Sequence, residues 1–132
     1  MSEKFICRVS ARFCFDAAHR MPNFPSEHPN SWLHGHSYTG DVFVEGEVDT
    51  TSGFVMDHGD LETQVNKVVG LLEHRYLNDI PELGLPTSEN LCRWIWVRLK
   101  PALPKLVEIQ LRRDTKGICV SYFGPTAAPK VL

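Results

Sequence analysis

"FICRVSARFCF", residues 5–15, alternates between apolar and mostly polar side chains along its whole length. The apolar residues occupy every odd position: Phe5, Cys7, Val9, Ala11, Phe13 and Phe15. Because successive side chains of a strand point to opposite faces, this pattern predicts a long strand with one face on a core. Such one-sided strands are typical of antiparallel sheets.

A loop and a second strand are predicted next. Residues 20–32, "RMPNFPSEHPNSW", contain three prolines and two asparagines. Because proline cannot donate to a strand ladder, this segment is expected to be a loop. The alternation resumes in residues 37–49 through Val42, Val44 and Val48, which predicts the second strand.

Two amphipathic helices are predicted in the middle of the chain. In residues 59–75, apolar residues recur every three or four positions: Leu61, Val65, Val68 or Val69, and Leu72. Thr87 or Ser88 is the expected N-cap of the second helix, and Glu89 is well placed in its first turn. The buried stripe of that helix consists of Leu91, Ile95 and Leu99. Pro101 should end it.

A closing hairpin completes the predicted fold. Two alternating segments, 107–111 and 118–122, flank the turn sequence "RRDTKG". The order ββααββ predicts an α+β fold, with an antiparallel four-stranded sheet and both helices on one face. At 132 residues, without an evident linker or repeat, residues 1–132 are expected to form one domain.

The composition argues against several classes of partner. The formal net charge is −2, and the 14 lysines and arginines are scattered, so nucleic-acid binding is not expected. The N-terminal residues lack the apolar core of a signal peptide, and no apolar stretch is long enough to span a bilayer. We therefore expect a cytoplasmic protein without membrane contact.

The four cysteines are predicted to be structural. Cys7, Cys14, Cys92 and Cys119 form no C-x-x-C pair, which favours free thiols in a reducing compartment. A free cysteine is commonly a small buried apolar residue, so burial is expected for all four.

Three of the six histidines form a candidate metal site. In "WLHGHSY", residues 32–38, His34 and His36 point to the same face of an extended segment. His19 ends the first predicted strand beside the start of the second. Three neutral imidazoles with one open position are typical of catalytic Zn²⁺, and no carboxylate triad favours iron instead. The alternative is three half-buried histidines at a strand edge without a metal.

Several motifs together resemble one enzyme family. The segments are "FDAAH" (15–19), "LHGH" (33–36), "EHRYLND" (73–79) and "PTSEN" (86–90). They are similar to the 6-pyruvoyl-tetrahydropterin synthase and 6-carboxytetrahydropterin synthase family, from about Phe5 to about Tyr122. "GEVD", "TSGFVMD" and "YLNDIP" are particularly similar to the bacterial branch of the queuosine pathway.

The resemblance implies a fold, an assembly and a reaction. The fold would be a T-fold whose subunits pair their sheets into a β-barrel, as a homohexamer made of two trimers with shared active sites. Zn²⁺ would be held by His19, His34 and His36. The substrate would be 7,8-dihydroneopterin triphosphate, and the product of the bacterial branch is 6-carboxy-5,6,7,8-tetrahydropterin.

The catalytic residues depart from the family pattern. The family's base is a cysteine four residues before the first histidine of His-Gly-His, where this chain has Asn30. An amide is not a general base. The family's Asp-His pair appears as Glu73-His74, so His74 is the leading proton-transfer candidate and Glu73 its orienter. The alternative is that both residues merely end a solvated helix. His28 and His58 are expected to be ordinary polar residues, and His28, in the loop, is a further candidate for the missing base.

The ring-binding residue is ambiguous. The family binds the guanidine-like edge of the pterin with a glutamate that precedes a threonine on the third strand, a bidentate pairing. Counting from "PTSE" places Arg113 there, whereas counting back from Tyr122 places Asp114 there. A bulge near Arg112 would favour Asp114. Glu89 is the other acidic candidate, and its neighbours Thr87 and Ser88 are the remaining substrate-binding predictions.

Three functions remain open at this point. The first is a zinc-dependent lyase that makes 6-carboxytetrahydropterin. The second is a paralogue that cleaves the side chain by a thiol-free retro-aldol step. The third is a pterin-binding protein without turnover.

Overall fold

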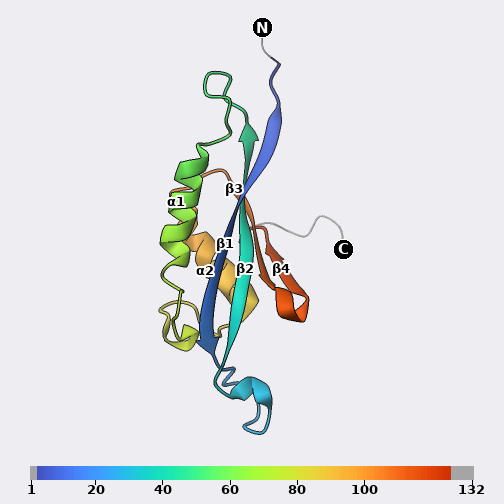
Figure 1. The fold of residues 1–132 in the computed structure, drawn as a ribbon, viewed down its shortest axis with the longest axis vertical. Coiled ribbons are helices and arrows are strands. Elements are labelled where there is room, and N and C mark those ends of the chain that lie inside the picture. The colour runs from blue at the N-terminus through green and yellow to red at the C-terminus, as the bar shows by residue number, and fades with distance from the viewer. Residues whose placement is uncertain (1–2, 126–132) are drawn as a thin grey trace.

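Four strands form one antiparallel sheet in the order β1-β2-β3-β4 (Figure 1). The computed structural model describes residues 3–125. The strands are β1 (Ile6–His19), β2 (His34–Glu47), β3 (Leu106–Arg113) and β4 (Ile118–Tyr122), and the helices are α1 (His58–Val69) and α2 (Ser88–Leu99). The predicted domain also includes residues 1–2 and 126–132, which lie outside the described residues.

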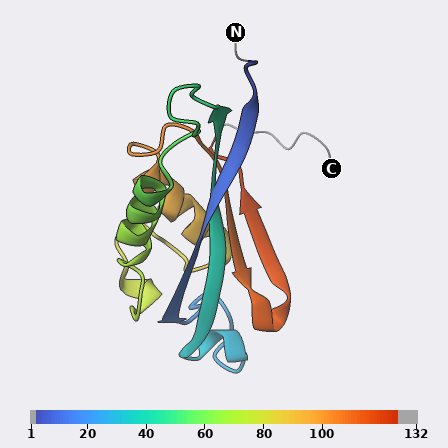
Figure 2. The same cartoon turned by 45° about the horizontal axis from the view of Figure 1, so that its top comes forward.

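Both helices cover the same face of the sheet (Figures 1 and 2). The core between the layers includes Phe15, Tyr38, Val42, Leu61, Leu91 and Ile95, all almost inaccessible to solvent. The opposite face, called here the helix-free face, carries charged side chains such as Arg12, Asp41 and Arg112. The predicted α+β architecture is confirmed.

The first two strands bring the histidines to one end of the sheet, with β1 ending at His19 as predicted. β1 continues past Phe15 to His19, and β2 already begins at His34. The two strands pair over their whole length, with His19 directly opposite His34. The burial alternation persists through Ala17 and His19, so the same face of the sheet reaches the candidate metal site.

The first helix is shorter than predicted. It ends at Val69 instead of near residue 75. The glycine that follows, Gly70, is a poor helix former, and the N–H groups of Leu71 and Leu72 bond to carbonyls only three residues back. The chain therefore leaves the helical path before it reaches Glu73.

Residues 73–76 run beside the edge of β1. The N–H of His74 donates to the carbonyl of Asp16 at 2.8 Å, and the N–H of Ala18 donates to the carbonyl of Arg75 at 3.0 Å. His74 has a φ of 56°, in the left-handed region that a bulky side chain rarely adopts. These bonds hold His74 next to the strand that ends in His19.

The second helix begins where the sequence indicates. Thr87 is the N-cap, and its side chain accepts a hydrogen bond from the N–H of Asn90. The helix ends at Leu99, before Pro101. No helix within residues 3–125 combines the length and apolar character needed to cross a membrane.

The predicted bulge near Arg112 is wrong. Arg112 pairs regularly with Thr39 of β2 and Cys119 of β4, and the register shift of the sheet lies between Phe43 and Val44. The turn that begins at Asp114 accommodates the hairpin instead, because it is a short 3-10 helix that ends in a left-handed glycine.

The predicted burial of the cysteines is correct for only one of them. Cys92 is buried in α2, whereas Cys7, Cys14 and Cys119 are exposed. Cys14 and Cys119 lie on the helix-free face, on the opposite side of their strands from the core. No disulfide forms among them, since all four are free thiols.

Candidate functional site

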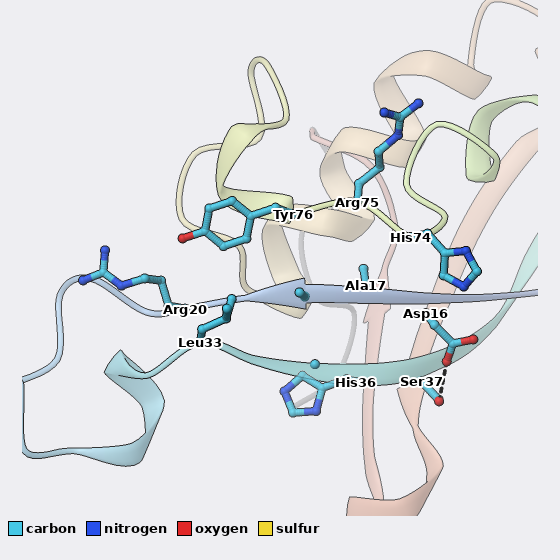
Figure 3. Close-up of a pocket in the computed structure, with 11 residues that line it drawn as sticks. Asp16, Ala17, Arg20, Leu33, His36, Ser37, His74, Arg75 and Tyr76 are labelled. Atoms are coloured by element: carbon cyan, nitrogen blue, oxygen red, sulfur yellow. Dashed lines mark hydrogen bonds between the residues drawn. The ribbon is translucent and has the colours of Figure 1, made fainter.

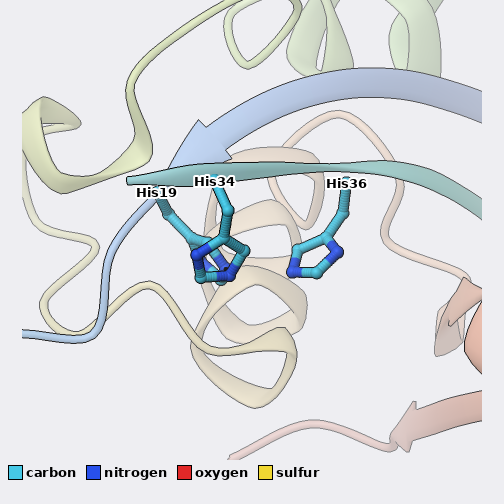
Figure 4. Close-up of side chains that lie close together, drawn as sticks. All are labelled: His19, His34 and His36. Atoms are coloured by element: carbon cyan, nitrogen blue, oxygen red, sulfur yellow. Dashed lines mark hydrogen bonds between the residues drawn. The ribbon is translucent and has the colours of Figure 1, made fainter. Parts of the chain in front are cut away.

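The three predicted metal ligands lie together on the helix-covered face of the sheet (Figure 4). His19 ends β1, and His34 and His36 begin β2. Their ring centroids are 4.6 to 5.0 Å apart. Each ring offers a nitrogen within 4.8 Å of those of the other two. The geometry therefore brings together all three residues that the motifs indicate.

Backbone carbonyls set the tautomers of two of these rings. Nδ1 of His19 lies 2.8 Å from the carbonyl oxygen of Pro86, and Nδ1 of His34 lies 2.7 Å from that of Trp32. Because a carbonyl only accepts, each Nδ1 carries the proton and each Nε2 keeps a lone pair in the neutral ring. Carbonyl contacts of this kind also orient metal-bound histidines.

The lone pairs of His19 and His34 face one another. Their Nε2 atoms are 3.0 Å apart, and burial lowers the pKa of His19 despite its carbonyl contact. Two neutral rings in these tautomers cannot bond to each other, so the arrangement is satisfied by a cation that both nitrogens bind. The donor set fits a metal ion.

The third histidine contacts an arginine. Nη1 of Arg113 lies 3.1 Å from Nε2 of His36. Burial and the positive charge of Arg113 lower the pKa of His36 to about 4. His36 is therefore neutral at physiological pH and accepts a hydrogen bond from the guanidinium.

A pocket of about 250 Å³ adjoins the histidine cluster. Apolar side chains form part of its wall: Met21, Phe24, Tyr38, Ile118 and Val120. Polar side chains form the rest, together with His19 and His34: Asn30, Thr87, Ser88, Glu89 and Arg113. Apolar walls with a few polar groups at the edge suit a small flat ring.

The structure separates the two ring-binding candidates of β3. Arg113 lines the pocket, whereas Asp114 does not. The carboxylate of Asp114 accepts from the hydroxyl of Thr39 at 2.7 Å and lies 3.6 Å from Nε of Arg112, on the helix-free side. Among the predicted carboxylates, only Glu89 lies at the pocket, so the role of Asp114 stays a prediction.

Asn30 lies at the position where the family's base is expected. It lines the pocket with His34, in the short turn that follows His28. All four cysteines belong to the described residues, and none of them lines this pocket. His28 is exposed, and its Nδ1 accepts from the N–H of Asn30 at 3.0 Å. The pocket therefore contains neither a thiol nor the imidazole of His28.

The predicted proton-transfer pair belongs to a second cluster. Oε1 of Glu73 lies 3.2 Å from Nε2 of His74, and Asp16 completes a group whose ligand atoms lie within 4.8 Å of one another. Asp16 also accepts a hydrogen bond from the hydroxyl of Ser37 (Figure 3). Asp16 was not predicted as a site residue, although its place in "FDAAH", on the opposite face of the strand from His19, was a usable signal.

The two clusters lie on opposite sides of the sheet. Asp16 and Ser37 form a cross-strand pair whose side chains point away from the face that carries His19 and His36. With His74, they line a second, open cavity of about 950 Å³ at the same end of the sheet (Figure 3). His36 also lines this cavity, although its side chain points to the other face of β2 from that of Ser37. Within one chain, the side chains of the two clusters therefore lie on opposite faces of the sheet.

A family model described as 6-pyruvoyl tetrahydropterin synthase matches residues 8–125. The chain belongs to this family. The 6-carboxy-5,6,7,8-tetrahydropterin synthase of Synechocystis sp. is 36% identical over 127 residues, which cover 92% of this chain and 96% of that protein. The dihydroneopterin monophosphate aldolase of Pyrococcus furiosus is 40% identical over 103 residues, which cover 78% and 83%.

A solved structure supports the same family. The 6-pyruvoyl tetrahydropterin synthase of Caenorhabditis elegans has a TM-score of 0.82 and 28% identity, and the match covers 95% of this chain and 100% of that one. The predicted T-fold is thereby confirmed for the single chain, and the relatives support an enzyme of the lyase type. The β-barrel assembly stays a prediction.

Proposed function

We propose that this protein is a zinc-dependent lyase that acts on the side chain of 7,8-dihydroneopterin triphosphate or a related pterin. The supporting observation is the histidine cluster, whose Nε2 lone pairs converge beside a pocket suited to a small ring. The proposed product is 6-carboxy-5,6,7,8-tetrahydropterin, the compound in the name of the Synechocystis relative. A place in the 7-deazapurine and queuosine pathway is part of the same proposal and rests on the motif resemblance alone.

His19, His34 and His36 would hold the metal. When bound there, Zn²⁺ would supply a Lewis acid that lowers the pKa of a hydroxyl group on the substrate side chain. The walls near Phe24 and Tyr38 would hold the ring, and Thr87, Ser88 and Glu89 would offer hydrogen bonds to its edge.

His74 would move the proton, oriented by Glu73. Because the sheet separates His74 from the histidine cluster of its own chain, the proposed active site combines the cluster of one chain with the His74 of a neighbour. An assembly is also favoured by the end strand β4, where Ile118 is exposed beside an unpaired ladder.

The proposed assembly is a homohexamer made of two trimers. Light scattering or sedimentation of the purified protein should give a mass close to six chains. A clean monomer at micromolar concentration would contradict a site shared between chains. The cytoplasmic location expected from the sequence is part of the same proposal.

A thiol-free aldolase is the second candidate. It is favoured by the pocket itself, which contains Asn30 and no cysteine. The Pyrococcus furiosus relative is named as an aldolase of a dihydroneopterin phosphate. A retro-aldol step would break the bond between the first two side-chain carbons, with His74 and Glu73 handling the proton.

Incubation of the zinc-loaded protein with dihydroneopterin triphosphate, followed by mass analysis, distinguishes these functions. A 6-carboxytetrahydropterin product supports the first candidate, and a 6-hydroxymethyl pterin supports the second. Binding without either product would support the non-catalytic alternative. Protein stripped of zinc by a chelator is the control, and it should form neither product.

A further inference from the structure

Arg113 is a cation in the histidine pocket without a matching anion. It ends β3 and lines both the 250 Å³ pocket and the adjoining surface near His34 and His36. Its Nη1 contacts His36 at 3.1 Å, and its buried Nε has no hydrogen-bond partner among residues 3–125. A buried donor without an acceptor is unfavourable.

Its neighbour Arg112 shows what a paired guanidinium looks like in this fold. Arg112 lies on the helix-free face, where Nη1 is 2.7 Å from Asp41 and Nε is 3.6 Å from Asp114. In the described part of the chain, Arg113 has no carboxylate within ion-pair distance, although Glu89 lines the same pocket. Asp41 of β2 and Asp114 of the turn thus pair with Arg112 on the helix-free face and not with Arg113.

A metal and Arg113 would compete for the same lone pair. Nε2 of His36, which accepts from Arg113, also points toward His34 (Figure 4). If a metal takes this nitrogen, Nη1 of Arg113 is released next to the already unpaired Nε. On a guanidinium, Nε–H and Nη2–H form the edge whose two parallel donors match the two oxygens of a carboxylate or of a phosphate group, and the released Nη1 adds a further donor.

We propose that Arg113 forms an oxyanion subsite beside the histidine cluster and selects a ligand with a carboxylate or phosphate there. The inference rests on the proposed function and deepens it by naming the residue that would bind an acidic group of the substrate or product. The amine edge of a pterin presents donors and would be repelled by the guanidinium. At this point of the pocket, the ligand therefore places its acidic substituent.

Binding of four pterins by the zinc-loaded protein tests this. Pterin and neopterin carry no anionic group, pterin-6-carboxylate has a carboxylate on the ring, and neopterin triphosphate has phosphates on the side chain. Fluorescence titration should show at least one acidic ligand binding about tenfold more tightly than its neutral counterpart. Tighter binding of pterin-6-carboxylate than of pterin identifies a ring carboxylate as the bound group. Tighter binding of neopterin triphosphate than of neopterin identifies the phosphates.

The variants assign the preference to Arg113. Arg113→Gln should bind acidic and neutral ligands almost equally, whereas Arg113→Lys should keep part of the preference. Arg12→Gln is the matched control, because Arg12 is 73% exposed on the helix-free face. It should behave as the wild type. Unfolding temperature and zinc content establish that each variant is folded and loaded.

An unchanged preference in Arg113→Gln would overturn the inference. So would a wild-type protein that binds acidic and neutral ligands alike or binds none of the four, a result that needs no variant. The proposed function is judged separately by product formation. Turnover without an acid preference refutes only the subsite, and an acid preference without turnover refutes only the enzyme.

Discussion

Two titratable clusters lie at the end of the sheet where β1 ends and β2 begins, and they differ in exposure and in how their side chains are held. The histidine cluster lies on the helix-covered face, where His19 is 6% exposed and two rings are held by backbone carbonyls. The second cluster lies on the other side, where the side chain of His74 is 79% exposed and Glu73 is its only ion-pair partner within residues 3–125. The histidine cluster is therefore preorganised within one chain, whereas the cluster around His74 is largely exposed to solvent.

The backbone differs in the same way. His19, His34 and His36 belong to long, fully paired strands. His74 belongs to an irregular segment and has a left-handed φ, a conformation that costs about 1–3 kcal/mol for a residue with a side chain. Such strain persists where surrounding bonds enforce it, as the bond to Asp16 does. The difference supports the proposal that one chain completes the metal site, whereas the proton-transfer site acts on a neighbouring chain.

The largest expected effect concerns the metal. We expect about one Zn²⁺ per chain. His34→Ala or His36→Ala should weaken zinc binding by about a thousandfold, because each removes one of the three protein ligands. Metal analysis after dialysis measures this. His28→Ala is the control, since His28 is an exposed loop residue. Variants that carry as much zinc as the wild type would disprove the assignment.

The next effect concerns proton transfer. His74→Ala should lower kcat by about 10²- to 10³-fold, the usual contribution of a general acid or base, without any change in zinc content. Glu73→Gln should have a smaller effect, because it removes only the group that orients the ring. Steady-state kinetics and metal analysis of the same samples check both. A loss of zinc in His74→Ala would mean that the two clusters are not separate.

Replacing Asn30 is expected to increase activity, whereas the substitutions above decrease zinc binding or activity. If the pocket binds dihydroneopterin triphosphate in the family's pose, Asn30→Cys should raise synthase activity about tenfold or more, roughly 1.4 kcal/mol of barrier. The physical reason is that a thiolate near the metal is a far better base than an amide.

The same variant also separates the candidates. No gain, together with lost activity in His74→Ala, would favour the thiol-free aldolase. No gain and no pterin binding would point to a non-catalytic protein.

The smallest effect tests whether water reaches the side chain of Tyr38 on the helix-covered face. Burial raises the pKa of Tyr38 to about 12 from 10.0. The unfolded chain therefore loses this proton first, and stability should fall between pH 10 and 12 by at most about 1.4 kcal/mol per pH unit. Tyr38→Phe should remove this part of the loss. Urea unfolding at pH 9 and pH 11 measures it, and identical losses in both proteins would mean that Tyr38 is hydrated.

The regular elements and the metal ligands could be predicted because each depends on a local pattern. Period-two alternation identified β1, and the apolar spacing of α2 identified its buried face. His34 and His36 follow from a single strand geometry. The pairing of His19 with His34 also follows from two antiparallel neighbours, once the strands are extended by a few residues.

The parts that could not be predicted depend on competing local and tertiary effects. The apolar spacing of α1 continues through Leu72, which is buried in the core although it follows the helix. The spacing therefore did not indicate that α1 ends at Val69. The position of Arg113 depends on whether a bulge exists in a short hairpin, which no residue pattern determines. Cys14 occupies an even position of β1, so the alternation of residues 5–15 already placed it away from the core, and the general tendency of free cysteine to be buried was the poorer guide.

Mixed assemblies test most directly the claim that the two clusters meet only between chains. His34→Ala and His74→Ala chains, coexpressed with different tags and purified through both, are each expected to be inactive alone. In a random mixture, half of the histidine clusters and half of the neighbouring His74 residues are intact, so about a quarter of the sites should work in a symmetric closed assembly. Recovery of roughly that share of wild-type turnover is predicted, and mixed assemblies no more active than their parents would contradict it.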